Sequence, residues 1–340
     1  MNDRYQRQER FYGIKREGQE KLSKARVAVV GLGALGSAIA EVLARAGVGY
    51  LRLIDRDFVE LHNLQRQLLY TEKDASEHRL KAEACSDHLS EINADIVLDP
   101  RAEDVRPGNI RALLSDVYLI LDGTDNMETR YLLNEFSVDQ KIPWIYGGVI
   151  EGKGMTMNFV PDGPCMTCMS GQTWPEVTDQ RTCSTAGVIA PAVMTVASLE
   201  CAEAMKILVG AETVRTECIS MDLWENKFHR FQPKKKGDCP ICGKHQYHYL
   251  GHASAGTRIV TLCGEDALQV LPEKRGEIDF ETMRKKLSPL GGVRVTKFCL
   301  FFENHEKTVE FELFHDGRAI IRGAGTEGRA REIYTDYIGN

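Results

Sequence analysis

The chain has 340 residues, of which 43% are hydrophobic and 27% are charged, with ten cysteines and a formal net charge of −6. This composition is typical of a globular protein, and the length predicts either one large and one small domain or two medium ones. Because the chain has 43 basic and 49 acidic residues, it lacks the excess positive charge that favours binding to nucleic acids. No apolar run is long enough to predict a membrane-spanning helix, and the polar start of the chain lacks the apolar segment of a secretion signal. We therefore expect a cytoplasmic protein without membrane contact, in which cysteines remain thiols or bind metal ions.

The first part of the chain alternates between predicted helices and predicted strands. A charged segment over residues 1–26 is expected to be helical, and short β-branched runs after it predict buried strands. The predicted strands span 27–30, 50–55, 95–98, 117–121 and 143–146, and the predicted helices span 37–46, 77–92, 108–114 and 127–140. This alternation predicts a parallel sheet with right-handed crossovers.

The alternation ends at Gly147-Gly148, and residues 149–160 then alternate in hydrophobicity as in an antiparallel hairpin. A long amphipathic helix is predicted over 189–209, followed by strands over 214–221 and 226–231. We therefore expect an α/β fold with a Rossmann-like, mostly parallel sheet that continues into antiparallel strands.

The composition changes at a three-lysine run, residues 234–236, which is typical of a solvated turn. After Cys242 the chain predicts a small α+β module. Its expected elements are short strands and one or two helices, which span 258–262, 267–271, 279–287, 293–302, 307–314, 318–321 and 326–337. We place the division between a first domain, 1–245, and the module, 246–340, for which the sequence predicts no role.

A glycine-rich turn, Gly31-x-Gly33-x-x-Gly36, lies between the first predicted strand and the helix after it. Glycines permit the tight turn and the close approach of phosphates, and a helix N-terminus attracts negative charge. Asp55 ends the next strand, where an acidic residue binds a ribose hydroxyl in dinucleotide-binding folds. The turn predicts nucleotide binding, and a tight packing turn without a ligand is the alternative.

Charged residues after Asp55 bear on which nucleotide would bind. A long polar loop follows it, with Arg66 near its end and Lys81 beyond, and such cations neutralise triphosphates rather than assist hydride transfer. Asp125 follows the fourth predicted strand, at the edge where ligands of open α/β sheets bind. It would act there through Mg²⁺, or it would cap the helix that begins at Met127, and the residues leave both interpretations open.

Two CxxC pairs, Cys165/Cys168 and Cys239/Cys242, lie in turns that contain glycine or proline. Four thiolates from two such pairs form a closed tetrahedral zinc site with a structural role, whereas a single pair could serve redox chemistry. The 70 or so residues between the pairs exceed the usual spacing of a zinc ribbon, so the fold would have to bring them together.

The remaining cysteines divide into two groups. Cys183 lies in a polar segment beside Arg181, which could lower the thiol pKa, although an incidental exposed cysteine is the alternative. The other five are expected to be small core residues; they are Cys85, Cys201, Cys218, Cys263 and Cys299.

Several motifs together resemble the ThiF/MoeB family of ubiquitin-activating-enzyme-like adenylyltransferases. They are Arg4-Tyr5-x-Arg7-Gln8, the glycine turn, Asp55-x-Asp57, Asn63-Leu64-Gln65-Arg66-Gln67, Thr124-Asp125-Asn126 with Arg130, the CxxC pairs, and Thr182-Cys183 before Ala186-Gly187-Val188. They cover about residues 1–245. The C-terminal module resembles that of the longer, Bacillus-type thiazole-biosynthesis members.

The resemblance implies an enzyme that uses Mg-ATP to adenylylate the C-terminal Gly-Gly carboxylate of a ubiquitin-like sulfur carrier, ThiS or alternatively MoaD, with release of pyrophosphate. Sulfur from a cysteine desulfurase would then give a thiocarboxylate. Positioning and charge neutralisation supply most of the catalysis in such a reaction. An NAD-dependent oxidoreductase and a non-catalytic carrier-binding scaffold are the competing hypotheses.

The resemblance also implies roles for individual residues. The glycines of the turn would hold the nucleotide, Asp55 the ribose and Asp125 the Mg²⁺, while Arg7 would reach the ATP of a second subunit in a homodimer. The whole implied ATP site is Arg7, Gly31, Gly33, Gly36, Asp55, Asp57, Asn63, Arg66, Lys81, Asp125 and Asn126. The implied zinc ligands are Cys165, Cys168, Cys239 and Cys242. Cys183 would attack the acyl-adenylate or receive sulfur.

Overall fold

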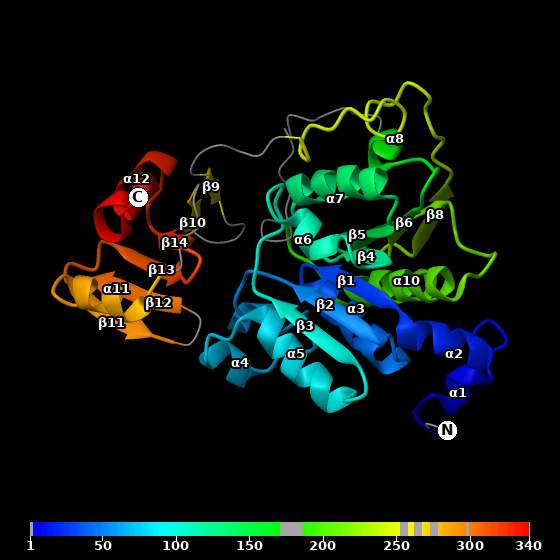
Figure 1. Ribbon diagram of the computed structural model, residues 1–340, viewed down its shortest axis with the longest axis horizontal. Helices are drawn as coiled ribbons and strands as arrows, with labels where there is room; N and C mark the ends of the chain where they lie inside the picture. Colours follow the sequence, from blue (N-terminus) through cyan, green and yellow to red (C-terminus); the bar gives the residue numbers. More distant parts are fainter. Residues whose placement is uncertain are drawn as a thin grey trace. The chain divides into compact units, whose positions relative to one another are not determined.

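The computed structural model describes residues 3–170, 186–251, 258–261, 267–272, 278–296 and 299–339. The chain divides into two compact units, residues 1–252 and residues 253–340 (Figure 1). The division expected from the sequence lies slightly earlier, after residue 245. Within the described residues, no helix is long and apolar enough to cross a membrane.

The first unit is built on an eight-stranded sheet in the order β3-β2-β1-β4-β5-β6-β7-β8. The strands are β1 (Arg26–Val30), β2 (Tyr50–Ile54), β3 (Val97–Arg101), β4 (Leu119–Asp122), β5 (Trp144–Ile150), β6 (Lys153–Phe159), β7 (Cys218–Asp222) and β8 (Lys227–Phe231). Pairing is parallel from β3 to β5 and antiparallel from β5 to β8. The expected mixed sheet is confirmed.

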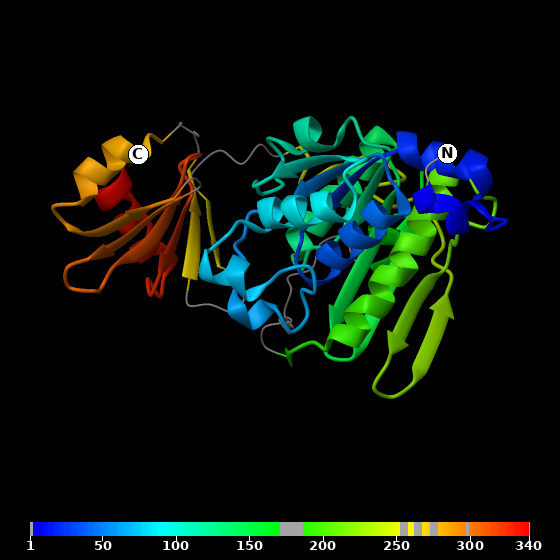
Figure 2. The same ribbon diagram turned by 90° about the horizontal axis from the view of Figure 1, so that it is seen from below.

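Helices cover both faces of this sheet (Figure 1). Alternate strand residues face opposite sides, so Val27 and Val29 pack with α3, α5 and α10, whereas Ala28 and Val30 pack with α6 and α7. Figure 2 shows α10 lying along the strands. The helices are α1 (Gln6–Glu9), α2 (Lys15–Lys24), α3 (Ala34–Ala46), α4 (Glu72–Ser76), α5 (Lys81–Ile92), α6 (Ile110–Leu114), α7 (Met127–Gln140), α8 (Met166–Ser170) and α10 (Ala190–Val209).

The second unit has a six-stranded antiparallel sheet in the order β11-β12-β13-β14-β10-β9. Its strands are β9 (Arg258–Thr261), β10 (Ala267–Leu271), β11 (Gly291–Val295), β12 (Cys299–Asn304), β13 (Glu310–Phe314) and β14 (Ala319–Arg322). Helices α11 (Phe280–Leu287) and α12 (Glu327–Ile333), with a π-helical turn over Tyr334–Ile338, pack on one face of the sheet. The unit is therefore α+β.

Three local differences from the expected elements have physical causes. The single element expected over 293–302 is wrong, because the chain reverses after Thr296, whose Oγ1 accepts a hydrogen bond from the Cys299 N–H at 3.1 Å, and two antiparallel strands result. The helix expected from residue 77 begins only at Lys81, since Leu80 is extended. An unexpected short helix, α4, is held by a capping box between Thr71 and Asp74.

Candidate functional site

The glycine turn joins the end of β1 to the start of α3, and its three glycines meet different structural requirements. Gly31 has a φ of 82°, which favours glycine, and a Cβ on Gly36 would lie 1.7 Å from the Gly31 carbonyl oxygen. A Cβ on Gly33 would meet only the Gln67 side chain, at 3.7 Å. Gly33 is also the N-cap of α3 and provides no side-chain cap. The first turn of α3 therefore presents N–H groups without a side-chain cap, next to a residue that has no side chain, as an anion site requires.

Asp55 lies at the end of β2, directly against this turn. Its carboxylate accepts hydrogen bonds from the N–H groups of Leu32 at 2.6 Å and Asp57 at 2.7 Å. Burial raises the pKa of Asp55, against the influence of Lys81 and of these two N–H donors. The structure thus places Asp55 where the sequence predicts it, with both oxygens already bonded to the backbone.

Lys81, the first residue of α5, is brought to Asp55 and Asp57. Its Nζ lies 3.3 Å from Asp57 Oδ2, and its N–H donates to the Asp57 carbonyl oxygen at 2.8 Å. Burial favours the neutral amine, but the charges of Asp57, Asp55 and Asp125 outweigh it and raise the pKa of Lys81. The lysine is therefore a buried cation at the carboxyl edge of the sheet.

A second cation lies in the same acidic surroundings. Arg56 Nη1 lies 3.1 Å from Asp104, and its Nε lies 3.6 Å from Asp57. Burial works against its charge, yet Asp104, Asp57, Asp55 and Asp125 raise the pKa of Arg56. Sequence reasoning did not place Arg56 among the site residues, and its position directly after the strand-ending Asp55 is the signal that could have found it.

Asn63 and Arg66 lie in the loop after β2, beside the glycine turn. Asn63 Oδ1 accepts a hydrogen bond from Arg66 Nη2 at 3.0 Å, and Arg66 Nη1 also donates to the His62 carbonyl oxygen. The loop is held against the turn by Tyr70, whose hydroxyl donates to the Leu32 carbonyl oxygen at 2.8 Å. Asn63 is buried and Arg66 is half-buried, so the pair is held within the loop that Tyr70 joins to the turn.

Asp125 and Asn126 occupy the loop between β4 and α7. Asn126 is the N-cap of α7, since its Oδ1 accepts a hydrogen bond from the Glu128 N–H at 2.8 Å. The alternative in which Asp125 caps this helix is therefore wrong. Asp125 is exposed, and within the described part of the chain its carboxylate makes no hydrogen bond or ion pair. It is an available oxygen donor near Lys81 and Arg56, which fits a hard cation such as Mg²⁺.

Gly123 is a packing residue of the site that sequence reasoning did not single out. A Cβ on Gly123 would lie 2.4 Å from the Gly31 carbonyl oxygen and 2.7 Å from Gly36 Cα. The ends of β1 and β4 can approach each other only because both positions are glycine. The signal was present as a glycine directly after an apolar strand.

Arg7 lies far from this edge of its own chain. It is an exposed residue of α1, and the next residue, Gln8, donates from Nε2 to the Ala46 carbonyl oxygen at the far end of α3. Since α3 has 13 residues, at a rise of about 1.5 Å each its two ends lie about 20 Å apart. The structure therefore does not bring Arg7 to the other residues of the predicted ATP site.

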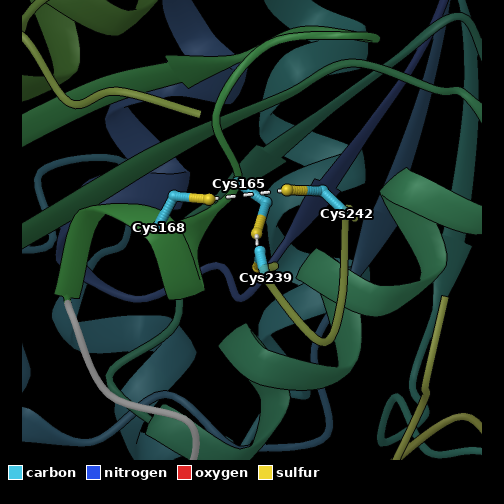
Figure 3. Close-up of side chains that lie close together, drawn as sticks. All are labelled: Cys165, Cys168, Cys239 and Cys242. Atoms are coloured by element: carbon cyan, nitrogen blue, oxygen red, sulfur yellow. Dashed lines mark hydrogen bonds between the residues drawn. The ribbon is translucent and has the colours of Figure 1, made fainter. Parts of the chain in front are cut away.

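The four cysteines of the CxxC pairs do come together, with their sulfurs directed at one centre (Figure 3). Cys165 Sγ lies 3.7 Å from Cys239 Sγ, and Cys168 Sγ lies 3.4 Å from Cys242 Sγ. Tetrahedral zinc with Zn–S bonds of about 2.3 Å would set the sulfurs about 3.8 Å apart. The geometry and the donor set thus fit a closed zinc site.

Helix α7 holds both cysteine pairs in place. Asn134 Oδ1 accepts a hydrogen bond from the Met166 N–H at 2.8 Å, which fixes the turn of the first pair. The Glu135 carboxylate accepts from the N–H groups of His248 at 2.9 Å and Leu250 at 2.8 Å, which fixes the chain after the second pair. Two adjacent residues of one helix therefore bring together segments that are distant in the sequence.

Cys183, the candidate for sulfur chemistry, lies outside the described residues, as does Cys263. The other four cysteines expected in the core are buried; they are Cys85, Cys201, Cys218 and Cys299. Burial raises the pKa of Cys218 to about 11 and that of Cys299 to about 12, so these two thiols are inert at neutral pH.

Known proteins are similar to this chain in sequence and in fold. The sulfur carrier protein ThiS adenylyltransferase of Bacillus subtilis (strain 168) is 38% identical over 342 residues, which covers 100% of both chains. The molybdopterin-synthase adenylyltransferase of Escherichia coli (strain K12) is 36% identical over 244 residues, which covers 71% of this chain and 96% of its own. The crystal structure of E. coli MccB with ATP matches with a TM-score of 0.63 over 71% of this chain and 75% of its own, at 23% identity, and shows a shared fold. The ThiF family matches residues 5–241, and the chain belongs to this family.

Proposed function

We propose that this protein is an adenylyltransferase that uses ATP to activate the C-terminal carboxylate of a small sulfur carrier protein. The observation that carries the proposal is the match to a ThiS adenylyltransferase over the whole of both chains. In the reaction, a carboxylate oxygen of the carrier forms a bond to the α-phosphorus of ATP, and the bond to the departing pyrophosphate breaks. The product is an acyl-adenylate. The persulfide of a cysteine desulfurase would attack its carbonyl carbon and displace AMP to give an acyl disulfide, and a thiol would then reduce the S–S bond to leave the thiocarboxylate and a disulfide.

The site residues supply the positioning and the charge that this reaction needs. The uncapped N-terminus of α3, where Gly33 has no side chain, receives phosphate oxygens, and Lys81 and Arg56 neutralise charge that develops on them. Asp55 faces the ribose, and Asn63 and Arg66 line the phosphate side. Mg²⁺, when bound, would screen the phosphate charges, and Asp125 is the residue that would hold it.

Two further parts of the proposal concern metal and subunits. Zinc bound by the four cysteines would be structural, because four protein ligands leave no position for water or substrate. A homodimer is supported by the place of Arg7, which lies at the opposite end of α3 from its own chain's glycine turn. Arg7 would complete the ATP site of the second subunit.

The match over the whole of both chains favours ThiS as the carrier, because that relative is a ThiS adenylyltransferase. The second unit alone does not distinguish the carriers, since the ThiS and molybdopterin relatives of Escherichia coli match 72% and 71% of this chain. The test is ATP–pyrophosphate exchange with purified ThiS-type and MoaD-type carriers offered in parallel, each with its Gly-Gly end intact. We expect exchange with the ThiS-type carrier and none with a variant that lacks the terminal glycine. Absence of exchange with both intact carriers, together with tight NAD binding, would refute the proposal.

A further inference from the structure

Arg130 is a buried arginine of α7 that bonds to three separate segments of the first unit. Its Nε donates to Asp122 Oδ2 at 3.0 Å, and its Nη2 donates to the carbonyl oxygens of Thr124 at 2.5 Å and Gly147 at 2.8 Å. The ring of Tyr146 lies 5.0 Å from the guanidinium carbon. One side chain therefore links the end of β4, the loop that carries Asp125, and β5.

The other residues of the same loop are also held. Asp122 Oδ1 accepts hydrogen bonds from both the N–H and the hydroxyl of Thr124, at 2.9 Å and 2.6 Å. The Gly123 N–H donates to the Val30 carbonyl oxygen at 2.8 Å, and Asn126 caps α7. Asp125 is thus the loop residue whose side chain is presented to solvent, between neighbours that are fixed on both sides.

Stability alone does not explain a buried ion pair at this position. Asp122 is fully buried, and the Arg130 side chain is only 10% exposed. The desolvation of two charges opposes folding, and apolar side chains of similar volume often serve stability as well or better. A planar guanidinium, in contrast, holds its acceptors in fixed directions within one plane. The three donors of a lysine ammonium rotate on a flexible stem, and an apolar side chain has no donor.

We propose that Arg130 is a positioning residue that orients the Asp125 carboxylate for magnesium. It fixes the carbonyl oxygen of the residue before Asp125 relative to β5, and it touches neither nucleotide nor metal itself. The inference rests on the proposed function, in which Asp125 holds Mg²⁺ beside the phosphates. Residues that orient a metal-ligating carboxylate typically contribute about 10- to 100-fold to metal affinity.

The test compares Arg130→Lys with the wild type in binding and in turnover. Calorimetry measures binding of a non-hydrolysable ATP analogue with and without Mg²⁺, and pyrophosphate exchange is titrated with Mg²⁺. We expect the variant to need at least about tenfold more Mg²⁺ for half-maximal exchange. We expect its affinity for the analogue without Mg²⁺ to stay within about twofold, because Arg130 acts through Asp125 alone.

The controls separate positioning from folding and from the proposed function. Arg111 is an exposed arginine of α6 that pairs with Asp139, a residue of the helix that also carries Arg130. The Mg²⁺ response of Arg111→Lys should match that of the wild type. Asp122→Asn keeps the side-chain shape at position 122 but removes the charge that pairs with Arg130. If Arg130→Lys fails to fold, this variant is tested by the same Mg²⁺ titration and calorimetry. An unchanged Mg²⁺ response, or an equal loss of analogue binding with and without Mg²⁺, overturns the inference. Absence of pyrophosphate exchange in the wild type would instead refute the proposed function.

Discussion

Glu200 of α10 provides a sharp test of the electrostatics of the first unit. The side chain is fully buried, and among the residues that the structure describes neither carboxyl oxygen has a hydrogen-bond partner. It packs so closely on β5 that a Cβ on Gly147 would lie 1.8 Å from Glu200 Oε1. Burial, with Asp122 nearby, raises the pKa of Glu200 well above its ordinary value of 4.5, against the influence of Arg130 and Arg215. The folded protein therefore holds a neutral Glu200 where the unfolded chain holds an ionised one.

The sign of the pH dependence follows from this difference. Above pH 4.5, the ordinary pKa, the unfolded chain binds fewer protons at this residue than the folded one, so stability falls as pH rises toward the folded pKa. The slope for one such group is about 1.4 kcal/mol per pH unit. The Glu200→Gln variant lacks this term. As the pH rises from 4.5 toward the raised pKa of the folded state, its free energy of unfolding should therefore increase relative to the wild type by up to about 1.4 kcal/mol per pH unit.

Urea unfolding followed by tryptophan fluorescence measures the gap in free energy of unfolding between variant and wild type. All three tryptophans, at positions 144, 174 and 224, precede residue 253, so the signal reports the first unit. Glu203→Gln, one turn further along α10, is the matched control. Burial opposes ionisation there as well, but bonds from Lys206, Arg215 and Asn158 lower the pKa of Glu203, so its gap should shrink on acidification through pH 4.5. A gap for Glu200→Gln that does not change with pH would show that the reasoning is wrong.

The other predictions concern the zinc site, the second subunit and the sulfur step. Purified protein should contain about one zinc ion per chain by elemental analysis, and Cys239→Ser should lose it together with thermal stability, since the four thiolates form a closed site; a zinc-free wild type would contradict this. Mixing inactive Arg7→Ala and Asp125→Ala proteins under subunit exchange should restore exchange activity in about a quarter of the sites, because half of the dimers then contain one intact shared site; no recovery would place Arg7 in its own chain's site or outside catalysis. Cys183→Ala should leave pyrophosphate exchange unchanged and impair thiocarboxylate formation, measured by mass spectrometry of the carrier; unimpaired sulfur transfer would remove Cys183 from the mechanism.

Local patterns were sufficient to predict most elements of the fold. The buried strand β1, the glycine turn and α3 follow from short-range periodicity and from backbone conformations that only glycine adopts readily. One error came from a single side-chain contact, the hydrogen bond to the Thr296 hydroxyl where the chain reverses between β11 and β12. A contact of that kind has no periodicity and is invisible to pattern analysis.

The sequence by itself determined the αβ alternation, the glycine turn and the presence of two CxxC pairs, because each depends on residues that are close together in the chain. Only the tertiary structure decided which distant segments meet. It brings Cys165 to Cys239 through hydrogen bonds from α7, and it assigns the helix cap to Asn126 so that Asp125 stays available. It also places Arg7 at the end of α3 opposite the glycine turn. These outcomes depend on packing between elements, which the order of residues along the chain does not reveal.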